Sequence, residues 1–402
     1  MAGIIVIGAG QAGSSLVVKL RALGCSSDIT LIGGEPVPPY QRPPLSKKYM
    51  LGEMDVERLF LRPEAFYGDQ NITLRLGVEV TEIDRDAKTV TLNTGEVLNY
   101  DQLALTTGSD PINLLSSIGG DLDGVYTVRS LADADAMAPD FVKGKRALIV
   151  GGGYIGLEAA AVAATRGVNV VLVEMADRIL QRVAAPETSD YFRALHTTRG
   201  VDIRESVGLA SLNGTGGRVT SATLTDGSEL EIDFAVIGVG IRPSLGLAEV
   251  IGLDLDNGIK VDGHGRTSDP SIFAAGDCTS FPHNGGRIRL ESVPNAIEQA
   301  EATAAAMLGD DAEYRAKPWF WSDQYDVKLQ IAGLNTGYDR VFSRKTDGAT
   351  SFWYYKCDKL LAVDAMNDPR AYMVGKRLIE AGKSPDPTAV QDTATDLKVL
   401  LK

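Results

Sequence analysis

The sequence predicts an α/β protein with two Rossmann-like domains and a C-terminal α+β domain. An apolar strand, a G-x-G-x-x-G turn and a helix follow one another twice, and the glycines begin at Gly8 and at Gly151. Each copy continues into a second apolar strand that ends at an acidic residue, Glu35 or Glu174. The composition changes after Pro318, where all three tryptophans of the chain lie.

The three glycines of the first copy have separate expected roles. Gly8 permits a tight turn, Gly10 lets the backbone approach a pyrophosphate, and Gly13 lets the helix pack closely on the strand. The helix N-terminus adds amides and a positive dipole for phosphate groups. Glu35 stands where such units hold a ribose hydroxyl. This copy is therefore predicted to bind a dinucleotide.

Length, composition and charge exclude several classes of protein. A chain of 402 residues is too long for one hydrophobic core, so we expect two or three domains. The chain is 44% hydrophobic and 23% charged and has no apolar run long enough to cross a bilayer, so we expect no membrane partner. A net charge of −13 argues against nucleic acid. The apolar run 4–7 is too short for a signal peptide, and we expect a cytoplasmic location.

The cysteines and histidines favour neither disulfide nor metal chemistry. Cys25, Cys278 and Cys357 are isolated from one another, so there is no C-x-x-C redox pair, and we expect each to be a buried small hydrophobic residue. The three histidines lack the spacing of metal ligands, and no metal site is predicted.

A loop rich in proline, residues 36–47, carries Arg42 and Lys47. Prolines fix the backbone, so this loop can hold the two cations in place. The alternative is an ordinary solvated basic loop.

The second copy carries information about the coenzyme. Two dinucleotide-binding units in one chain imply two dinucleotides. Glu174 accepts from a free 2′-hydroxyl and repels a 2′-phosphate, which favours NADH over NADPH. Arg178 and Arg182 lie close by in the sequence, and either could reach a phosphate instead.

The remaining segments complete the predicted order of elements. A short buried strand ends at Gly276-Asp277, which places a carboxylate at a sheet edge where it can accept from ribose or ribityl hydroxyls. The alternative is a simple turn. The predicted strands cover 4–7, 29–32, 73–76, 89–92, 102–105, 146–150, 168–173, 235–243 with its glycine turn, and 272–275, and the predicted helices lie within 16–23, 159–165 and 294–307.

The order of these motifs resembles one family over nearly the whole chain. The segments that carry the resemblance are P-Y-Q-R-P-P-L-S-K at 39–47, A-A-G-D at 274–277, R-L-E-S-V-P-N-A at 289–296 and P-W-F-W-S-D-Q at 318–324. By these segments the chain is similar to the FAD-dependent NADH:ferredoxin reductases of the glutathione-reductase superfold, the putidaredoxin and rubredoxin reductase type. Within this resemblance, Val293 favours the putidaredoxin reductase branch, since dioxygenase-type members tend to carry Trp there.

The resemblance implies domain boundaries and cofactor contacts. It implies an FAD domain at 1–110 and 235–316, an NAD domain at 111–234 and an α+β interface domain at 317–402. It implies FAD contacts at Gly8, Gly10, Ala12, Gly13, Glu35, Arg42, Lys47, Val80, Arg129, Asp277, Val293 and Trp321. The contacts expected for NADH are Gly151, Gly153, Tyr154, Ile155, Gly156, Glu174, Arg182 and Gly240.

The resemblance also implies a mechanism and a partner. NADH passes a hydride to the flavin, Lys47 and Glu158 form an ion pair beside flavin N5, and single electrons leave to a [2Fe–2S] ferredoxin that serves a haem-thiolate monooxygenase. The alternatives are a rubredoxin or dioxygenase ferredoxin as acceptor, and an FAD- and NADH-binding signalling protein of the apoptosis-inducing-factor type. The oligomeric state is left open.

Overall fold

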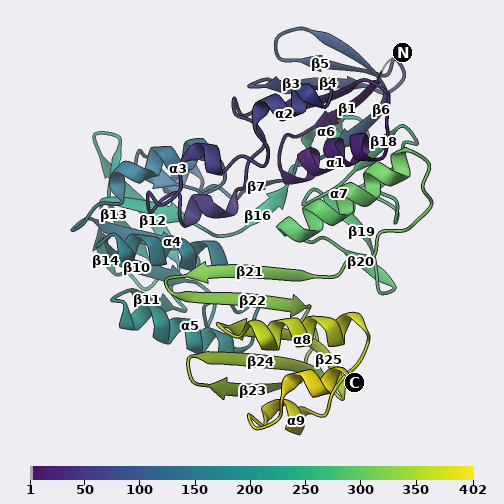
Figure 1. Ribbon diagram of the computed structural model, residues 1–402. Coiled ribbons are helices and arrows are strands. Elements are labelled where there is room, and N and C mark those ends of the chain that lie inside the picture. The colour runs from purple at the N-terminus through teal and green to yellow at the C-terminus, as the bar shows by residue number, and fades with distance from the viewer. Residues whose placement is uncertain (1–2) are drawn as a thin grey trace. The chain divides into compact units, whose positions relative to one another are not determined.

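The computed structural model describes residues 3–402, and the chain forms two compact units (Figure 1). Unit 1 contains residues 3–41, 55–110 and 242–318. Unit 2 contains Arg42–Met54, Pro111–Ile241 and Trp319–Lys402. The fold is α/β with an α+β C-terminal portion, as predicted. The proposed three-domain division, with its boundaries, stays a prediction.

Unit 1 is built on a sheet in the order β3-β2-β1-β6-β5-β4, with β18 beside β6. The strands β1, β2, β3, β6 and β18 are parallel, whereas β4, β5 and β6 form an antiparallel meander. The bounds are β1 Gly3–Ile7, β2 Ile29–Gly33, β3 Ile72–Leu76, β4 Val80–Asp84, β5 Thr89–Leu92, β6 Val97–Leu105, β17 Ile259–Lys260, β18 Ile272–Ala274, β19 Thr279–His283, β20 Gly286–Ile288, α1 Gln11–Ala22, α2 Glu64–Asp69, α6 Gly246–Val250 and α7 Val293–Met307.

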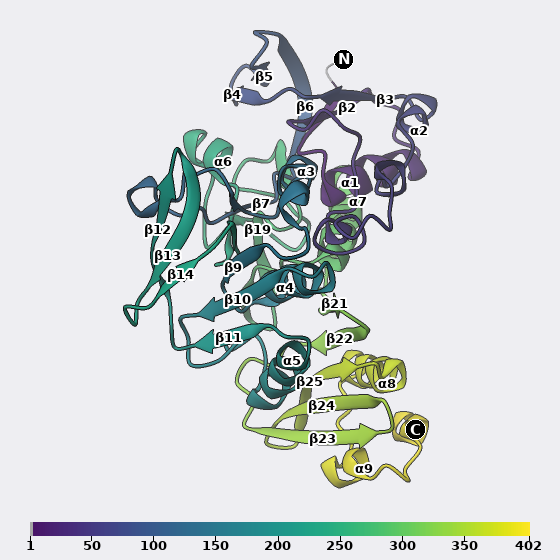
Figure 2. The same cartoon turned by 90° about the vertical axis from the view of Figure 1, so that its left-hand side faces the viewer.

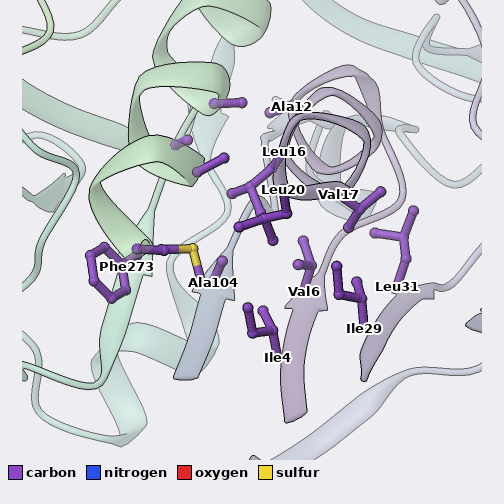
Figure 3. Close-up of a cluster of buried hydrophobic side chains, with 14 of the residues drawn as sticks. Ile4, Val6, Ala12, Leu16, Val17, Leu20, Ile29, Leu31, Ala104 and Phe273 are labelled. Carbon is purple, nitrogen blue, oxygen red and sulfur yellow. The ribbon is translucent and has the colours of Figure 1, made fainter. Parts of the chain in front are cut away.

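The strand β1 is apolar throughout because both of its faces are buried. Ile4 and Val6 belong to the core cluster that includes Leu16 and Leu20 of α1 (Figure 3), and Ile5 belongs with Ile7 to a separate cluster. Successive side chains of a strand point to opposite faces. The helices α1 and α7 pack together over the first cluster. The helix α1 begins at Gln11, with Gly10 as its N-cap, so Gly13 lies in its first turn.

The first sheet of unit 2 repeats the strand, turn and helix arrangement. Its strands are all parallel and run in the order β11-β10-β9-β15-β8. The predicted segment 235–243 is two strands rather than one, because Gly240 takes φ +124 between them. The bounds are β8 Val125–Tyr126, β9 Arg146–Val150, β10 Asn169–Glu174, β11 Asp202–Glu205, β12 Leu209–Thr215, β13 Arg218–Leu224, β14 Glu229–Glu231, β15 Phe234–Ile237, α3 Leu131–Met137, α4 Tyr154–Thr165 and α5 Pro186–Thr198. The chain passes from one unit to the other after Gln41, Met54 and Pro318, and also within β7 Ser109–Pro111 and β16 Ile241–Pro243.

The C-terminal part of unit 2 is an antiparallel sheet in the order β21-β22-β25-β24-β23. The helix α8 packs on β22 and β25 (Figures 1 and 2). The buried guanidinium of Arg344 donates to the backbone carbonyls of Val390, Asp392, Thr393 and Thr395, which ties down the last segment of the chain. The bounds are β21 Trp319–Gln324, β22 Val327–Gly333, β23 Arg340–Thr346, β24 Ala349–Lys356, β25 Lys359–Met366, α8 Pro369–Glu380 and α9 Pro387–Gln391.

The expectation that each of the three cysteines is buried holds fully only for Cys278 and is wrong for Cys357. Cys278 is buried and Cys25 is half-buried, but Cys357 is exposed in the turn between β24 and β25, where its φ is +50. All three thiols are free. Among residues 3–402 no helix is both long and apolar enough to cross a membrane, and no cluster of side chains suited to a metal ion occurs there.

A buried carboxylate joins α5 to the C-terminal sheet. Asp364 of β25 is 1% exposed, and its Oδ2 accepts from Thr188 of α5 at 2.7 Å and from the hydroxyl of Tyr354. Tyr354 in turn accepts from the Ala185 amide at 3.1 Å. Burial raises the pKa of Asp364 to about 6, because the charged form is poorly solvated there.

We expect this carboxylate to make stability depend on pH. The folded pKa lies above the unfolded value, so the folded chain binds more protons between about pH 4 and 6, and stability falls as the pH rises through that range. From pH 4 to pH 7 the free energy of unfolding of the wild type should fall by about 2 kcal/mol relative to that of the Asp364→Asn variant, because an asparagine side chain does not titrate. Urea unfolding of both proteins at the two pH values measures the difference. An equal pH dependence in both proteins would contradict it.

Candidate active site and nucleotide cradles

The first glycine turn is shaped by close backbone contacts at two of its three glycines. Gly8 has φ +111, and a Cβ there would lie 2.2 Å from the carbonyl oxygen of Thr106. A Cβ on Gly13 would lie 2.0 Å from the carbonyl oxygen of Gly8. A Cβ on Gly10 would meet nothing within 4 Å. Gly8 and Gly13 are therefore required by the fold, whereas Gly10 leaves open space above the backbone.

The second turn repeats this geometry residue for residue. Gly151 has φ +105, and its Cβ would lie 2.4 Å from the Gly238 carbonyl oxygen. A Cβ on Gly156 would lie 2.0 Å from the Gly151 carbonyl oxygen, and one on Gly153 would meet nothing within 4 Å. The open position is again the middle glycine.

The helices α1 and α4 follow the two glycine turns, and the N-terminus of each lies at the open middle glycine without a side-chain cap. Gly10 and Gly153 are the N-caps of α1 and α4, neither helix has a side-chain cap bond, and neither has an acidic residue in its first turn. The first amides of each helix thus keep their hydrogen-bonding capacity for an anion. Open space, unsatisfied amides and a positive helix end fit the pyrophosphate of a dinucleotide in both units.

The acidic residue after each second strand is held in a defined position. In unit 1, Glu35 accepts from the Tyr40 hydroxyl at 2.6 Å. In unit 2, Glu174 accepts from the Gly152 amide at 2.7 Å and from the Ala176 amide at 2.8 Å. The bond to Gly152 fixes the Glu174 carboxylate beside the glycine turn, where it places negative charge.

The two arginines near Glu174 differ in their surroundings. Arg178 donates to the Ser189 hydroxyl at 2.5 Å and to the Ala184 carbonyl at 2.8 Å, so its guanidinium is engaged within its own loop. Arg182 is exposed and makes no hydrogen bond or ion pair within residues 3–402. Its Nη2 lies 3.9 Å from the position that a Cβ on Gly240 would take. Of the two, only Arg182 is free to meet a ligand.

The other unit 1 residues expected at FAD lie at strand and helix ends. Asp277 follows β18, and its carboxylate accepts from the Ser109 hydroxyl at 3.1 Å. Ala12 is buried, 3.0 Å from where a Cβ on Gly276 would lie. Val80 is half-buried at the start of β4, and Val293 is the first residue of α7, which Ser292 caps.

In unit 2, Lys47 and Glu158 form a largely buried ion pair. Lys47 Nζ lies 2.6 Å from Glu158 Oε2, and the two side chains are 14% and 5% exposed. The same Oε2 accepts from Ser46 at 2.8 Å, and Oε1 accepts from Ser322 of β21 at 2.6 Å. Three donors thus surround one carboxylate. Such hydrogen bonds offset the cost of removing a charged group from water.

This pair explains why Arg42–Met54 groups with unit 2, although the prediction assigned 1–110 to the first domain. Ser46 and Lys47 are bound to Glu158 of α4, and Leu45 is buried. Arg42 Nη1 donates to the Arg129 carbonyl at 2.6 Å in the same unit.

The aromatic residues expected at the cofactors lie on or next to β21. Trp321 is half-buried, with its ring 5.6 Å from that of Trp319. Tyr154, the first residue of α4, packs on Phe320 at 5.1 Å, and its hydroxyl is buried with no partner among the described residues. Burial raises the pKa of Tyr154 well above its ordinary value. Ile155 is 42% exposed, which leaves it accessible to a ligand.

Sequence reasoning missed four polar residues that this geometry connects to Glu158: Ser46, Ser322, Gln324 and His196. Ser46 precedes Lys47 and Ser322 follows Trp321, so their position next to predicted site residues could have identified them. Nothing in the sequence connects His196 to Gln324, because 128 positions separate them.

Comparisons with known proteins agree over the whole chain. Residues 2–300 match the family described as pyridine nucleotide-disulphide oxidoreductase, and residues 319–401 match the reductase C-terminal domain. Rhodocoxin reductase of Rhodococcus erythropolis is 40% identical over 99% of this chain and 94% of its own length.

Two solved structures are similar throughout. Putidaredoxin reductase, in its covalent complex with putidaredoxin, has a TM-score of 0.95 at 38% identity and covers 99% of this chain and 97% of its own. The ferredoxin reductase for the CYP199A2 system from Rhodopseudomonas palustris has a TM-score of 0.96 at 37% identity and covers 99% of each chain. The chain therefore belongs to the pyridine nucleotide-disulphide oxidoreductase family, in its branch of ferredoxin reductases with a reductase C-terminal domain.

Proposed function

We propose that the protein is an NADH-dependent reductase that carries FAD and passes single electrons to a [2Fe–2S] ferredoxin. The observation that carries this proposal is the pair of matching glycine turns, each with an open middle position, which provides for two dinucleotides in one chain. The similarity to reductases named for rhodocoxin and putidaredoxin supports a small electron-transfer protein as the acceptor. A haem-thiolate monooxygenase as the final consumer, and a cytoplasmic location, are part of the same proposal.

The chain's own residues would divide the work as follows. Gly8, Gly10 and Gly13 would hold the FAD pyrophosphate, and Gly151, Gly153 and Gly156 that of NADH. Bound FAD supplies the switch from a two-electron donor to a one-electron acceptor. Lys47 would provide positive charge for flavin reduction, and Glu158 would hold the Lys47 ammonium in place.

The cysteines support an external acceptor over a protein disulfide. The only buried thiol, within residues 3–402, is that of Cys278, and burial raises its pKa, which makes it a poor nucleophile. Without a pair of neighbouring cysteines, electrons cannot leave through a disulfide exchange on this chain.

Stopped-flow absorbance tests the proposal. NADH should bleach the flavin rapidly, and a [2Fe–2S] ferredoxin added next should be reduced with turnover. Fast flavin reduction without transfer to any iron–sulfur acceptor would favour the signalling alternative. Electron transfer to a rubredoxin or a dioxygenase ferredoxin, but not to a monooxygenase ferredoxin, would change the proposed acceptor while leaving the proposed reductase reaction intact.

The coenzyme preference depends on Glu174. We expect Glu174→Arg to shift the ratio of kcat/KM values toward NADPH by about tenfold or more, since the carboxylate repels a 2′-phosphate and a guanidinium binds it. Glu174→Gln, which keeps an acceptor for the Gly152 amide, is the control and should shift the ratio less. An unchanged NADH/NADPH ratio in Glu174→Arg would remove Glu174 from coenzyme selection.

A further inference from the structure

A continuous line of hydrogen bonds, buried except at its last, partly buried bond, leads away from the ion pair. Ser322 joins Glu158 Oε1 at 2.6 Å, and Gln324 Nε2 joins the Ser322 hydroxyl at 3.2 Å. Gln324 Oε1 lies 2.8 Å from His196 Nε2, and His196 Nδ1 lies 3.3 Å from the Tyr325 hydroxyl. Ser322, Gln324 and His196 are 0% exposed. We refer to Ser322, Gln324, His196 and Tyr325 as the relay.

The alternation of β21 produces this line. Phe320, Ser322 and Gln324 lie on one face of the strand, and these three contact Tyr154, Glu158 and His196 in turn. The first two of those partners are on α4 and the third is on α5. One strand thus places polar atoms in line between two helices of the same unit.

The carboxylate dictates the direction of every bond in the relay. An ionised carboxylate can only accept, so Ser322 donates to Glu158. The Ser322 oxygen then accepts from the Gln324 amide nitrogen, which turns the Gln324 carbonyl oxygen toward His196. That oxygen requires a proton on His196 Nε2, and the unprotonated Nδ1 accepts from Tyr325. All four donors therefore point toward Glu158.

We propose that the relay is a positioning device for the reduction step, in which His196 and Gln324 orient Ser322 and so hold the Glu158 carboxylate fixed against Lys47. This inference rests on the proposed function, because the pair it supports is the one assigned to flavin reduction. Hydrogen bonds that share one direction polarise and strengthen one another. Burial lowers the pKa of His196, which keeps the ring neutral as the relay requires.

The wild-type protein provides the first test. The chain has three histidines, so nitrogen NMR of the holoenzyme can resolve His196, assigned by its loss in His196→Phe. The expected result is a neutral ring protonated at Nε2. A ring protonated at Nδ1 would overturn the proposal, and this measurement needs no variant to be active.

Two variants test the coupling. Gln324→Leu breaks the relay, and we expect flavin reduction at saturating NADH to slow about three- to tenfold while the Kd of NADH is unchanged. Thr188→Val is the matched control. Thr188 lies on α5, the helix that carries His196, and is also fully buried. Its loss breaks the separate bond to Asp364, which shares no hydrogen bond with Glu158 or the relay among residues 3–402.

These experiments distinguish failure of the relay from failure of the proposed function. Equal slowing in Thr188→Val would show a general loosening of α5 and reject the relay, as would an unchanged rate in Gln324→Leu. The Ser322→Thr variant keeps the hydroxyl and should retain most of the rate that Ser322→Ala loses. If NADH does not reduce the wild-type flavin, the proposed function fails, while the His196 ring still reports whether the relay exists.

Discussion

The Lys47→Ala variant should be reduced by NADH about a hundredfold more slowly than the wild type, while its FAD content falls much less than its rate. A fixed cation that stabilises charge developing in a transition state is worth about that factor in other sites of low water content. Lys47 is 14% exposed and 2.6 Å from Glu158, so its ammonium is held rather than free in water. Stopped-flow bleaching of the flavin at saturating NADH measures the rate directly.

Loss of stability must be separated from loss of chemistry in this experiment. Removing Lys47 leaves Glu158 with two hydroxyl donors, and we expect an unfolding cost of about 2 kcal/mol. Lys145→Ala is a suitable control, because Lys145 makes a 2.6 Å pair with the buried Asp140 in the same unit. That variant should lose stability but keep its reduction rate. A wild-type rate in Lys47→Ala would exclude the ion pair from the reaction.

The glycine turns were predictable because their glycines have a fixed spacing along the chain. Gly13 lies against the carbonyl of nearby Gly8, and the spacing of the two glycines encodes this contact. Gly8 meets Thr106, which is distant in the sequence, but the positive φ of Gly8 belongs to the turn itself. The apolar run of β1 likewise follows from burial on both faces. The positions of Glu35 and Glu174 were also predictable, because each acidic residue follows the glycine turn at a similar spacing, at or just after the end of a strand.

The relay and the grouping of Arg42–Met54 were not predictable in this way. His196, Gln324 and Glu158 approach one another only because β21 returns to α4 and α5 after more than a hundred residues. Single-sequence patterns report the period of an element and its caps, but not which distant polar side chains meet. The exposed Cys357 shows the converse limit, since a left-handed turn interrupts what reads as a continuous aromatic strand.

The Gly156→Ala variant is expected to lose much of its stability. A methyl group there would lie 2.0 Å from the Gly151 carbonyl oxygen, a backbone atom that cannot move without displacing the turn. We expect Gly156→Ala to lower the free energy of unfolding of this part of the chain by about 3 kcal/mol or more. Thermal unfolding with and without NADH measures the loss, and a melting temperature equal to that of the wild type would contradict the steric argument.

Gly153→Ala is the informative partner of that variant, since its methyl group would enter open space. Its backbone angles, φ −78 and ψ 178, are allowed for alanine. Alanine is a poorer N-cap than glycine, so a stability loss of at most about 1 kcal/mol is expected. The KM for NADH should nevertheless rise about tenfold or more, because the methyl group takes space proposed for the pyrophosphate.

Gly10→Ala, the equivalent substitution in the first glycine turn, tests which of the two turns binds FAD and which binds NADH. Gly10 has the same open surroundings as Gly153, so Gly10→Ala should also fold. If the first cradle holds FAD, Gly10→Ala should lower the FAD content of the purified protein, whereas Gly153→Ala should keep its FAD and weaken only NADH. The opposite pattern would exchange the two assignments, and loss of both ligands in either variant would show that the two cradles do not act independently.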